Sequence, residues 1–301
     1  MAKDLGDVRR SQVVTSHGPG SIVDFRAGGR GGGAVSVVAA GLEEWDRQAS
    51  PPGLAHPQTV FEPRLQQLLG VGGFRLPPVA PQTRPGVYAR NVGKLVGVRF
   101  PRWLQCPECK DLREARRWSE DPGDPALYCG ECSDRAGGRN RVHVVPARFI
   151  VMCENGHLDE FPWLWWVKHK ETCGKRGDLR LEGSAAAGLV GLVLTCLECG
   201  NSRSMEGCFG PGAIPAQCRG RRPWLGIDAD EECGAEPHVA QRGASNIYFS
   251  AVESALDIPP YTDEAPKEAR GALGTARPGA QRRDPPRPRP VLPARRAHRL
   301  A

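Results

Sequence analysis

"CENGHLDEFPWLWWVKHKETC", residues 153–173, brings two cysteines, two histidines and three tryptophans together within 21 positions. Three residues separate Cys153 from His157, and three separate His169 from Cys173, so the stretch holds two ligand pairs in mirror-image order. Cysteine and histidine at such spacings are typical of zinc ligands. The question is whether these four side chains can reach one ion.

The path of the chain between the two histidines decides this question. One continuous helix from His157 to His169 would place them about 18 Å apart, at a rise of about 1.5 Å per residue. Pro162 argues against such a helix, because proline fits the first turn of a helix and disfavours helix before it. We therefore expect a turn over residues 157–161, followed by a short helix over residues 162–170 that returns towards Cys153.

Two ligand assignments remain open for this stretch. In the first, one Cys2His2 zinc site uses all four ligand side chains, namely Cys153, His157, His169 and Cys173. In the second, the first two of these join a later Cys-x2-Cys pair, Cys196 and Cys199. Tryptophan buries a large apolar area, so we expect a core around the site to contain Trp163, Trp165 and Trp166.

The most specific cysteine pattern lies upstream, where Cys106-Pro-Glu-Cys109 and Cys129-Gly-Glu-Cys132 are separated by 19 residues. This spacing is typical of a four-thiolate zinc ribbon. Each turn is tight enough to direct two sulfur atoms at one tetrahedral ion, at about 2.3 Å each. A redox dithiol usually stands alone beside a βαβ pattern, whereas two matched pairs occur here. The pattern therefore predicts a structural zinc site.

A second four-thiolate site is predicted further along the chain. The pair Cys196 and Cys199 follows the apolar segment 188–195, which reads as a strand, and two single cysteines follow at Cys218 and Cys233. Together they form the pattern C-x2-C-x18-C-x14-C. Cys208 is left without a predicted role.

The composition favours a loop-rich protein. The 301 residues include 37 glycines and 28 prolines, and only 6% are aromatic, which argues against one large regular sheet or bundle. The chain is nevertheless long enough to bury a sizeable core. We expect an α+β fold with two or three small zinc-ribbon-like modules. Its expected parts are a β-rich N-terminal segment (1–100), a first zinc ribbon (101–150), a second zinc-binding region (151–260) and a disordered Pro/Arg-rich tail (261–301).

Local patterns refine the N-terminal segment. Residues 11–25 read as a strand, a Gly-Pro-Gly turn and a second strand. Residues 34–45 predict a strand followed by a short helix, and residues 61–70 predict a short amphipathic helix. The glycine-rich run 26–33 lacks the Gly-Lys-Ser/Thr ending of a phosphate-binding loop, so we expect a flexible loop there.

The positive charge is concentrated at one end of the chain. The net charge is +7, of which residues 262–301 contribute +6 and the other 261 residues only +1. The overall charge therefore does not indicate nucleic-acid binding by the body. No apolar run reaches the roughly 18 residues that span a membrane, and residues 1–12 lack the apolar core of a secretory signal. We expect a cytoplasmic protein without a membrane partner, in which the 11 cysteines bind metal rather than form disulfides.

Arginines nevertheless cluster beside the cysteine pairs. Arginine next to an aromatic on a rigid module suits phosphate contact and stacking, although a solvated surface explains such residues equally well. The candidates for DNA contact are Arg113, Arg116, Arg117, Arg139, Arg141, Arg219, Arg221 and Arg222, with Arg135 and Arg148 in the same segments.

Catalysis is not expected. A catalytic zinc keeps three protein ligands and an open position. A zinc deaminase would need His-x-Glu and a later Pro-Cys-x-x-Cys, but Glu160 lies three positions after His157 and no proline precedes a Cys-x2-Cys pair. No His-Glu-x-x-His motif occurs either. We therefore predict no catalytic residue and no small-molecule substrate.

Five segments occur in an order that points to a known family. They are "RRSQVVTSHGPGSIVDF", "FP" followed by the first ribbon, "CENGHLDEFPWLWW", "CRGRRPWLG" and "RGASNIYF". Together, over residues 9–258, they resemble the DrmB family, a component of the bacterial DISARM anti-phage defence system. The resemblance implies a non-catalytic partner of a DrmA-type helicase, which engages DNA alongside a methyltransferase.

The resemblance also implies a difference in length. Family members are usually much longer and carry a C-terminal zinc-binding domain. The residues after Pro260 do not resemble the family, so we expect this chain to lack that domain, as a truncated or frame-shifted copy would.

Three functions from different classes remain. The first is a zinc-stabilised accessory subunit of a DISARM-like system that partners a helicase and contacts DNA. The second is a stand-alone zinc-ribbon nucleic-acid-binding protein, which would bind DNA tightly without partners. The third is a zinc metalloenzyme, which would leave one ligand position open. The family resemblance favours the first.

Overall fold

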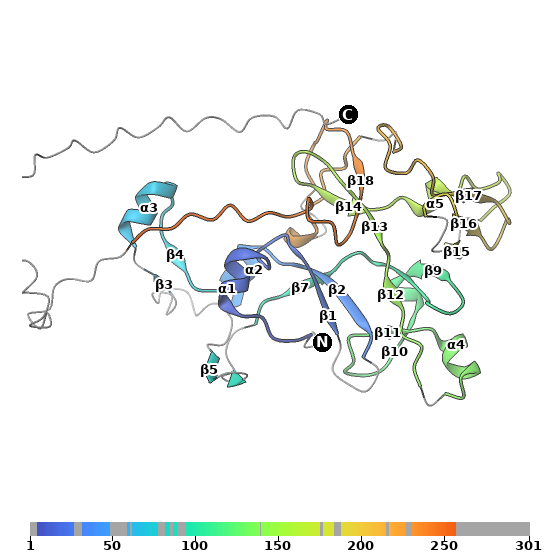
Figure 1. Cartoon of the computed structure of the whole chain (residues 1–301), viewed down its shortest axis with the longest axis horizontal. Helices are drawn as coiled ribbons and strands as arrows, with labels where there is room; N and C mark the ends of the chain where they lie inside the picture. Colours follow the sequence, from blue (N-terminus) through green and yellow to red (C-terminus); the bar gives the residue numbers. More distant parts are fainter. Residues whose placement is uncertain are drawn as a thin grey trace, which may run out of the picture. The chain divides into compact units, whose positions relative to one another are not determined.

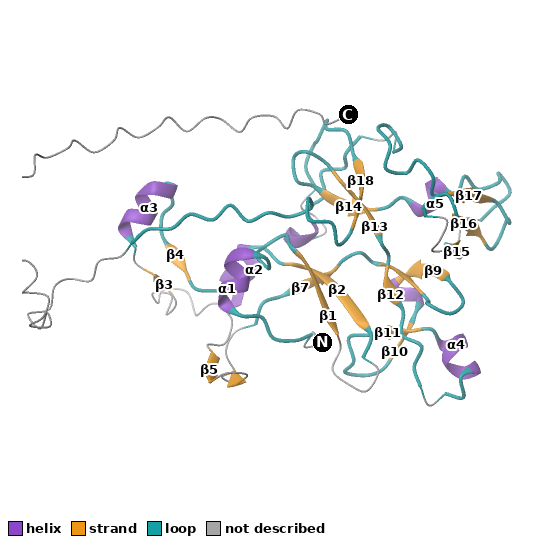
Figure 2. Cartoon of the chain, in the orientation of Figure 1, coloured by secondary structure: helices purple, strands orange, loops and turns teal. Residues whose placement is uncertain are grey.

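The computed structural model describes residues 5–26, 32–48, 59–60, 62–77, 82–84, 87–88, 94–138, 140–174, 177–183, 188–214, 217–226 and 230–256. Met1–Ala255 form one compact unit, whose elements are labelled in Figure 1. The predicted disordered tail over 261–301 lies outside the described residues, as does most of the glycine-rich run 26–33. Figure 2 shows that loops and turns separate most of the short elements. The chain is thus α+β, rich in strands and poor in helix, as predicted.

The N-terminal part contains a three-stranded antiparallel sheet in the order β1-β2-β7. Its strands and the neighbouring helices are α1 (Arg10–Thr15), β1 (Ile22–Arg26), β2 (Ala34–Ala39), α2 (Leu42–Gln48) and β7 (Gly97–Arg99). The predicted strand over 34–39 and the helix after it are confirmed. The predicted strand at the start of 11–25 is wrong, because α1 occupies it. Two adjacent valines favour a strand only weakly, and the helix buries Val13 alone while the Gln12 side chain accepts the Arg9 N–H at 2.9 Å.

The helix predicted over 61–70 is also present, as α3 (Pro63–Leu69). Proline occupies its first turn, and Gly70 ends it in the left-handed conformation with φ 64°. One two-stranded sheet pairs β3 (Thr59–Val60), which precedes α3, with β4 (Phe74–Arg75), which follows it. A second pairs β5 (Gln82–Arg84) with β6 (Val87–Tyr88), further along the chain.

A six-stranded antiparallel sheet has the order β12-β8-β9-β15-β16-β17. Its members are β8 (Trp103–Gln105), β9 (Asp111–Glu114), β12 (Val145–Pro146), β15 (Leu179–Gly183), β16 (Leu192–Cys196) and β17 (Ser202–Ser204). Inward and outward residues alternate along β15, where Leu179 and Leu181 are buried and Arg180 is not. Strands from both sides of residue 150 belong to this one sheet. The division into separate ribbon modules stays a prediction.

The second three-stranded sheet has the order β14-β13-β18. It consists of β13 (Phe149–Met152), β14 (Leu158–Glu160) and β18 (His238–Gln241), and α5 (Trp163–Trp166) follows β14. The turn predicted over 157–161 is therefore wrong, since three of its residues form β14. The helix predicted over residues 162–170 is shorter in the structure, where α5 contains only Trp163–Trp166. Leu158 is buried opposite Met152. Burial of this apolar side chain favours a hairpin here over a loop.

Small elements complete the unit. They are β10 (Ser119–Glu120) paired with β11 (Leu127–Tyr128), α4 (Gly130–Arg135), and 3-10 turns η1 (Ala115–Arg117) and η3 (Pro223–Leu225). The longest helices have seven residues, so no helix among the described residues is long and apolar enough to cross a membrane.

The main core joins the six-stranded sheet to β13 and α5. Leucines from three strands of that sheet pack in the same cluster as Phe149, Phe161, Trp163 and Trp166. The rings of Phe161 and Trp163 lie 4.6 Å apart, centroid to centroid, which suits aromatic packing. The prediction that all three tryptophans are buried fails for Trp165, whose side chain is 44% exposed.

Candidate metal centres

Three groups of four side chains bring their sulfur and ring-nitrogen atoms within 4.8 Å of one another. We call them the first, second and third tetrads. The first consists of Cys106, Cys109, Cys129 and Cys132. The second consists of Cys153, His157, Cys218 and Cys233. The third consists of His169, Cys173, Cys196 and Cys199.

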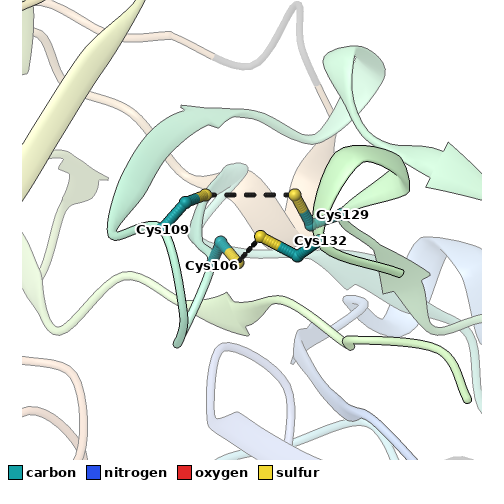
Figure 3. A group of neighbouring side chains, drawn as sticks. All are labelled: Cys106, Cys109, Cys129 and Cys132. Carbon is teal, nitrogen blue, oxygen red and sulfur yellow. Dashed lines mark hydrogen bonds between the residues drawn. The ribbon is translucent and has the colours of Figure 1, made fainter. Parts of the chain in front are cut away.

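The first tetrad contains four thiols that face one another (Figure 3). The Sγ atoms of Cys106 and Cys132 lie 3.7 Å apart, and those of Cys109 and Cys129 lie 3.9 Å apart. Four sulfur atoms at about 2.3 Å from a tetrahedral ion lie about 3.8 Å from one another, whereas a disulfide requires about 2.05 Å. The four cysteines are free. The spacing therefore fits a shared tetrahedral ion and not two disulfides.

A hairpin turn positions the first two of these thiols. The backbone N–H of Cys106, at the end of β8, donates to the Asp111 carbonyl at 2.9 Å, and the N–H of Lys110 donates to the Cys106 carbonyl at 3.1 Å. Lys110 adopts the left-handed conformation, with φ 64°. This closes a tight turn between β8 and β9 with both sulfur atoms on one side.

The β16–β17 turn repeats this arrangement in the third tetrad. The N–H of Cys196 donates to the Asn201 carbonyl at 2.8 Å, and the N–H of Gly200 donates to the Cys196 carbonyl at 2.9 Å. Gly200 has φ 70° and stands where the first turn has Lys110. Glycine takes this conformation without strain, whereas a side chain makes it costly.

The remaining ligand pair of the first tetrad lies at α4. Cys129 directly precedes this helix, and Cys132 lies in its first turn. The Arg135 guanidinium, one turn later, donates to the Cys132 Sγ at 2.9 Å. An arginine in this position stabilises a negatively charged sulfur atom, as partners of metal ligands commonly do.

The second tetrad is built on the β13–β14 hairpin. Cys153 and His157 lie at its turn, where the N–H of Gly156 donates to the Cys153 carbonyl at 3.0 Å. The His157 Nδ1 atom lies 3.3 Å from the Cys153 Sγ and 3.6 Å from the Cys218 Sγ. Nitrogen and sulfur ligands of one tetrahedral zinc lie about 3.6 Å apart, so these distances also fit a shared ion.

Three further residues hold His157 in this orientation. Its Nε2 atom lies 2.6 Å from the Glu231 carboxylate, which also accepts a hydrogen bond from Arg222 at 2.6 Å. A Cβ atom on Gly220 would lie 1.7 Å from the Glu231 carbonyl oxygen, and Gly220 has φ 63°. Only glycine at position 220 therefore lets this carboxylate reach the histidine.

The third tetrad lies after α5 and beside the main core. The His169 Nδ1 atom lies 3.2 Å from the Cys173 Sγ and 3.9 Å from the Cys199 Sγ, and the Sγ atoms of Cys173 and Cys196 lie 3.8 Å apart. In contrast to His157, the Nε2 atom of His169 is buried without a hydrogen-bond partner among the described residues.

The groupings predicted from residues 153–173 and from the later cysteines are wrong. The structure divides the stretch, so that Cys153 and His157 face the C-terminal cysteines, and His169 and Cys173 face the Cys-x2-Cys pair. The reason is β14, which together with α5 leads the chain away from Cys153 instead of back to it. Neither the predicted Cys2His2 set nor the predicted second four-thiolate set comes together, whereas the first four-thiolate set does.

The surroundings of the thiols suit a positively charged ion. In the second tetrad, burial raises the pKa of Cys218 to about 12, while the Ala235 N–H and the Asn155 amide lower the pKa of Cys233 to about 7. In the third tetrad, two backbone N–H groups lower the pKa of Cys199 to about 6. Thiols packed this closely cannot all ionise without a nearby cation, because their charges repel. Sulfur and imidazole donors in tetrahedral sets are those that zinc prefers, so all three tetrads fit zinc.

Cys208 belongs to none of the tetrads. Its side chain is fully buried in the main core, and burial raises the pKa of its thiol to about 11. It packs as a small apolar residue.

Most arginines predicted to contact DNA are paired with carboxylates. Arg141 forms two 3.0 Å bonds to Asp121. The other pairs, with N–O distances of 2.6–3.7 Å, are Arg113 with Asp111, Arg116 with Glu114, Arg117 with Asp178, Arg219 with Asp159, Arg221 with Asp159 and Asp230, and Arg222 with Glu231. Arg139 lies outside the described residues. DNA contact by these arginines stays a prediction.

Sequence reasoning missed the partners of the ligands. Arg135, Asn155 and Glu231 contact Cys132, Cys233 and His157. Glu231 lies 74 residues from His157, so no local spacing could reveal it. Arg135 follows Cys132 by three positions in a helical segment, a spacing that places two side chains on one face and could have indicated this contact.

Two comparisons with known proteins identify the family. The model of a family described as "Domain of unknown function (DUF8724)" matches residues 9–249. The DISARM protein DrmB of Bacillus paralicheniformis (strain ATCC 9945a / NCIMB 11709 / CD-2) is 33% identical over 178 residues, which cover 56% of this chain. The matched region spans only 30% of that relative. The family resemblance of the motifs is thereby confirmed, and the chain belongs to the DUF8724 family and is a relative of DrmB.

Proposed function

We propose that the chain is a zinc-stabilised, non-catalytic component of a DISARM-type anti-phage defence system. The observation that supports this most directly is that each tetrad supplies four protein donors, the ligand number of a closed structural zinc site. A catalytic zinc needs a position for water or substrate. The similarity to DISARM protein DrmB supports the defence context.

The zinc ions would be held by the three tetrads, and each would supply folding energy. Other residues of this chain position the ligands. In each tetrad a hairpin turn directs two of the four donors towards the site. Arg135 stabilises the charge of Cys132, and Glu231 orients His157. Through β15, which pairs with both β9 and β16, the hairpins of the first and third tetrads belong to one sheet.

We further propose that the chain acts with a DrmA-type helicase and contacts DNA weakly by itself. To bind DNA, most of the described candidate arginines must give up an ion pair with a carboxylate before they can contact a phosphate. The loss of that ion pair reduces the net free energy of DNA binding. Arg116 is the most available, since its side chain is 80% exposed. A partner helicase would add the remaining contacts.

Elemental analysis of protein purified without added zinc tests the metal part of this proposal. Three zinc ions per chain are expected. A zinc content near zero would indicate that the cysteines have a redox function instead. Two ions would leave one tetrad without a structural role, and a Cys→Ser variant of each tetrad would show which one.

Co-purification with a DrmA-type helicase and fluorescence anisotropy with a labelled single-stranded DNA test the partner part. We expect a stable complex, and DNA affinity that rises at least tenfold when the helicase is added. Tight, salt-dependent binding by the isolated chain would instead favour a stand-alone nucleic-acid-binding protein.

A further inference from the structure

One surface groove combines cationic and aliphatic side chains. It encloses about 840 Å³ between the β8–β9 turn, strand β12, the β15–β16 hairpin and the end of β18. Aliphatic side chains line much of it, including Val145, Leu181, Leu189 and Leu192. None of the described lining residues is acidic.

Three cations lie on this groove, namely Lys110, Arg148 and Arg242. Arg242 pairs with Asp24. Lys110 and Arg148 are exposed, and among the described residues neither lies within ion-pair distance of a carboxylate. They contrast with the paired arginines beside the tetrads. The groove therefore presents two exposed cations to a partner.

The backbone at Lys110 strengthens this contrast. The equivalent position of the β16–β17 turn is Gly200, the residue that this conformation favours. A lysine at φ 64° costs about 1 kcal/mol in conformational energy, and among the described residues its ammonium group donates only to the Pro107 carbonyl. The conformation belongs to the Cys-x2-Cys turn, and Gly200 shows that this turn does not require a side chain there, so Lys110 adds a charge to the groove that the turn itself does not need.

We propose that the groove binds an extended peptide segment of a partner protein, in which acidic residues alternate with aliphatic ones. Val145, Leu189 and Leu192 accept apolar side chains. Lys110 and Arg148 accept carboxylates. Single-stranded nucleic acid fits less well, because bases need an exposed aromatic face. Among the described lining residues the only aromatic is Phe149, which is fully buried. Recognition uses side chains, because Pro146 lacks the N–H that pairing of a new strand with β12 requires.

This inference does not depend on the metal centres or on the helicase, so its test can fail while the proposed function holds. A library of random twelve-residue peptides is selected for binding to the full zinc-loaded chain and counter-selected on the Arg148→Glu variant. The enriched peptides are then measured by fluorescence anisotropy at two salt concentrations.

We expect enrichment of Asp and Glu that alternate with Leu, Ile or Val. Binding should weaken at least tenfold with Arg148→Glu and severalfold with Lys110→Gly, which removes charge while giving the turn its favoured residue. Arg64→Glu on α3 makes the same charge change outside the groove, and it should leave affinity unchanged.

Three results would overturn the proposal. One is the absence of any sequences enriched on the chain over the Arg148→Glu variant. Another is enrichment of neutral or basic peptides. The third is that binding of a twenty-residue oligothymidylate depends on Arg148 while binding of the peptides does not. That result would make the groove a nucleic-acid site.

Discussion

The first and second tetrads hold four donors each, but their ligands are distributed very differently along the chain. The first spans 27 residues, from Cys106 to Cys132, and its cysteines lie within a cluster that includes Leu104, Trp118 and Val144. The second joins Cys153 to Cys233 across 81 positions, and six of the eleven described residues between Cys218 and Cys233 are exposed. Metal in the first tetrad would thus support a small core. Metal in the second would fasten a more exposed segment that is also held by Trp224, which packs against the cluster around Ile150.

The largest expected effect distinguishes these two roles directly. Cys129→Ser should remove one zinc per chain and lower the free energy of unfolding by several kcal/mol, because the cluster around it buries few other apolar residues. Cys218→Ser should also remove one zinc but lower the free energy of unfolding less, since the packing of Trp224 against the cluster around Ile150 holds this segment without the metal. Thermal unfolding with elemental analysis measures both, and equal losses of stability would contradict the comparison.

The hairpin of the second tetrad also carries a pH dependence. Burial raises the pKa of Glu160 to about 7, and its Oε2 atom has no hydrogen-bond partner among the described residues. The folded state therefore binds a proton that the unfolded chain has lost, so stability falls as the pH rises from about 4.5 to about 7. Glu160→Gln should be more stable than the wild type at pH 8, by at most about 3 kcal/mol.

Denaturant unfolding of both proteins between pH 6 and pH 8.5 measures this difference. The gain should shrink as the pH falls. A constant difference across this range would mean that Glu160 is ionised throughout.

A smaller effect tests whether Glu231 positions His157. Glu231→Leu should release the zinc of the second tetrad to a chelator ten- to hundredfold more readily, as loss of a ligand's hydrogen-bond partner typically does. Glu232→Leu removes the neighbouring exposed carboxylate and serves as the matched control. Equal zinc release from the two variants would mean that the 2.6 Å contact has no role in metal binding.

The smallest effect compares the two turns with the same backbone. Lys110→Gly should stabilise the chain slightly, and Gly200→Lys should destabilise it by about 1 kcal/mol, because a side chain is strained at positive φ. Urea unfolding at constant zinc resolves the pair. A destabilised Lys110→Gly variant would show that the lysine side chain contributes more than the strain costs.

Sequence reasoning was most successful where the relevant contacts are local. The β2–α2 unit, helix α3, the apolar strand before Cys196 and the strand-rich fold class follow from short periodic patterns and turn residues. It was least successful at α1 and β14, where the burial of Val13 and of Leu158 overrides the local preference. Leu158 packs with Val38, Phe100 and Ala240, which lie far from it in sequence.

The sequence by itself determined which residue types could bind metal, the tight turns that bring the members of each Cys-x2-Cys pair together, and the family. Each of these depends on short segments of sequence, in which the backbone restricts how neighbouring residues can be arranged. Only the tertiary structure decided which pairs share a tetrad, that Glu231 reaches His157, and that Lys110 and Arg148 lie on one groove. Those outcomes depend on how β13, β14 and β18 pair, which places residues far apart in sequence within hydrogen-bonding distance.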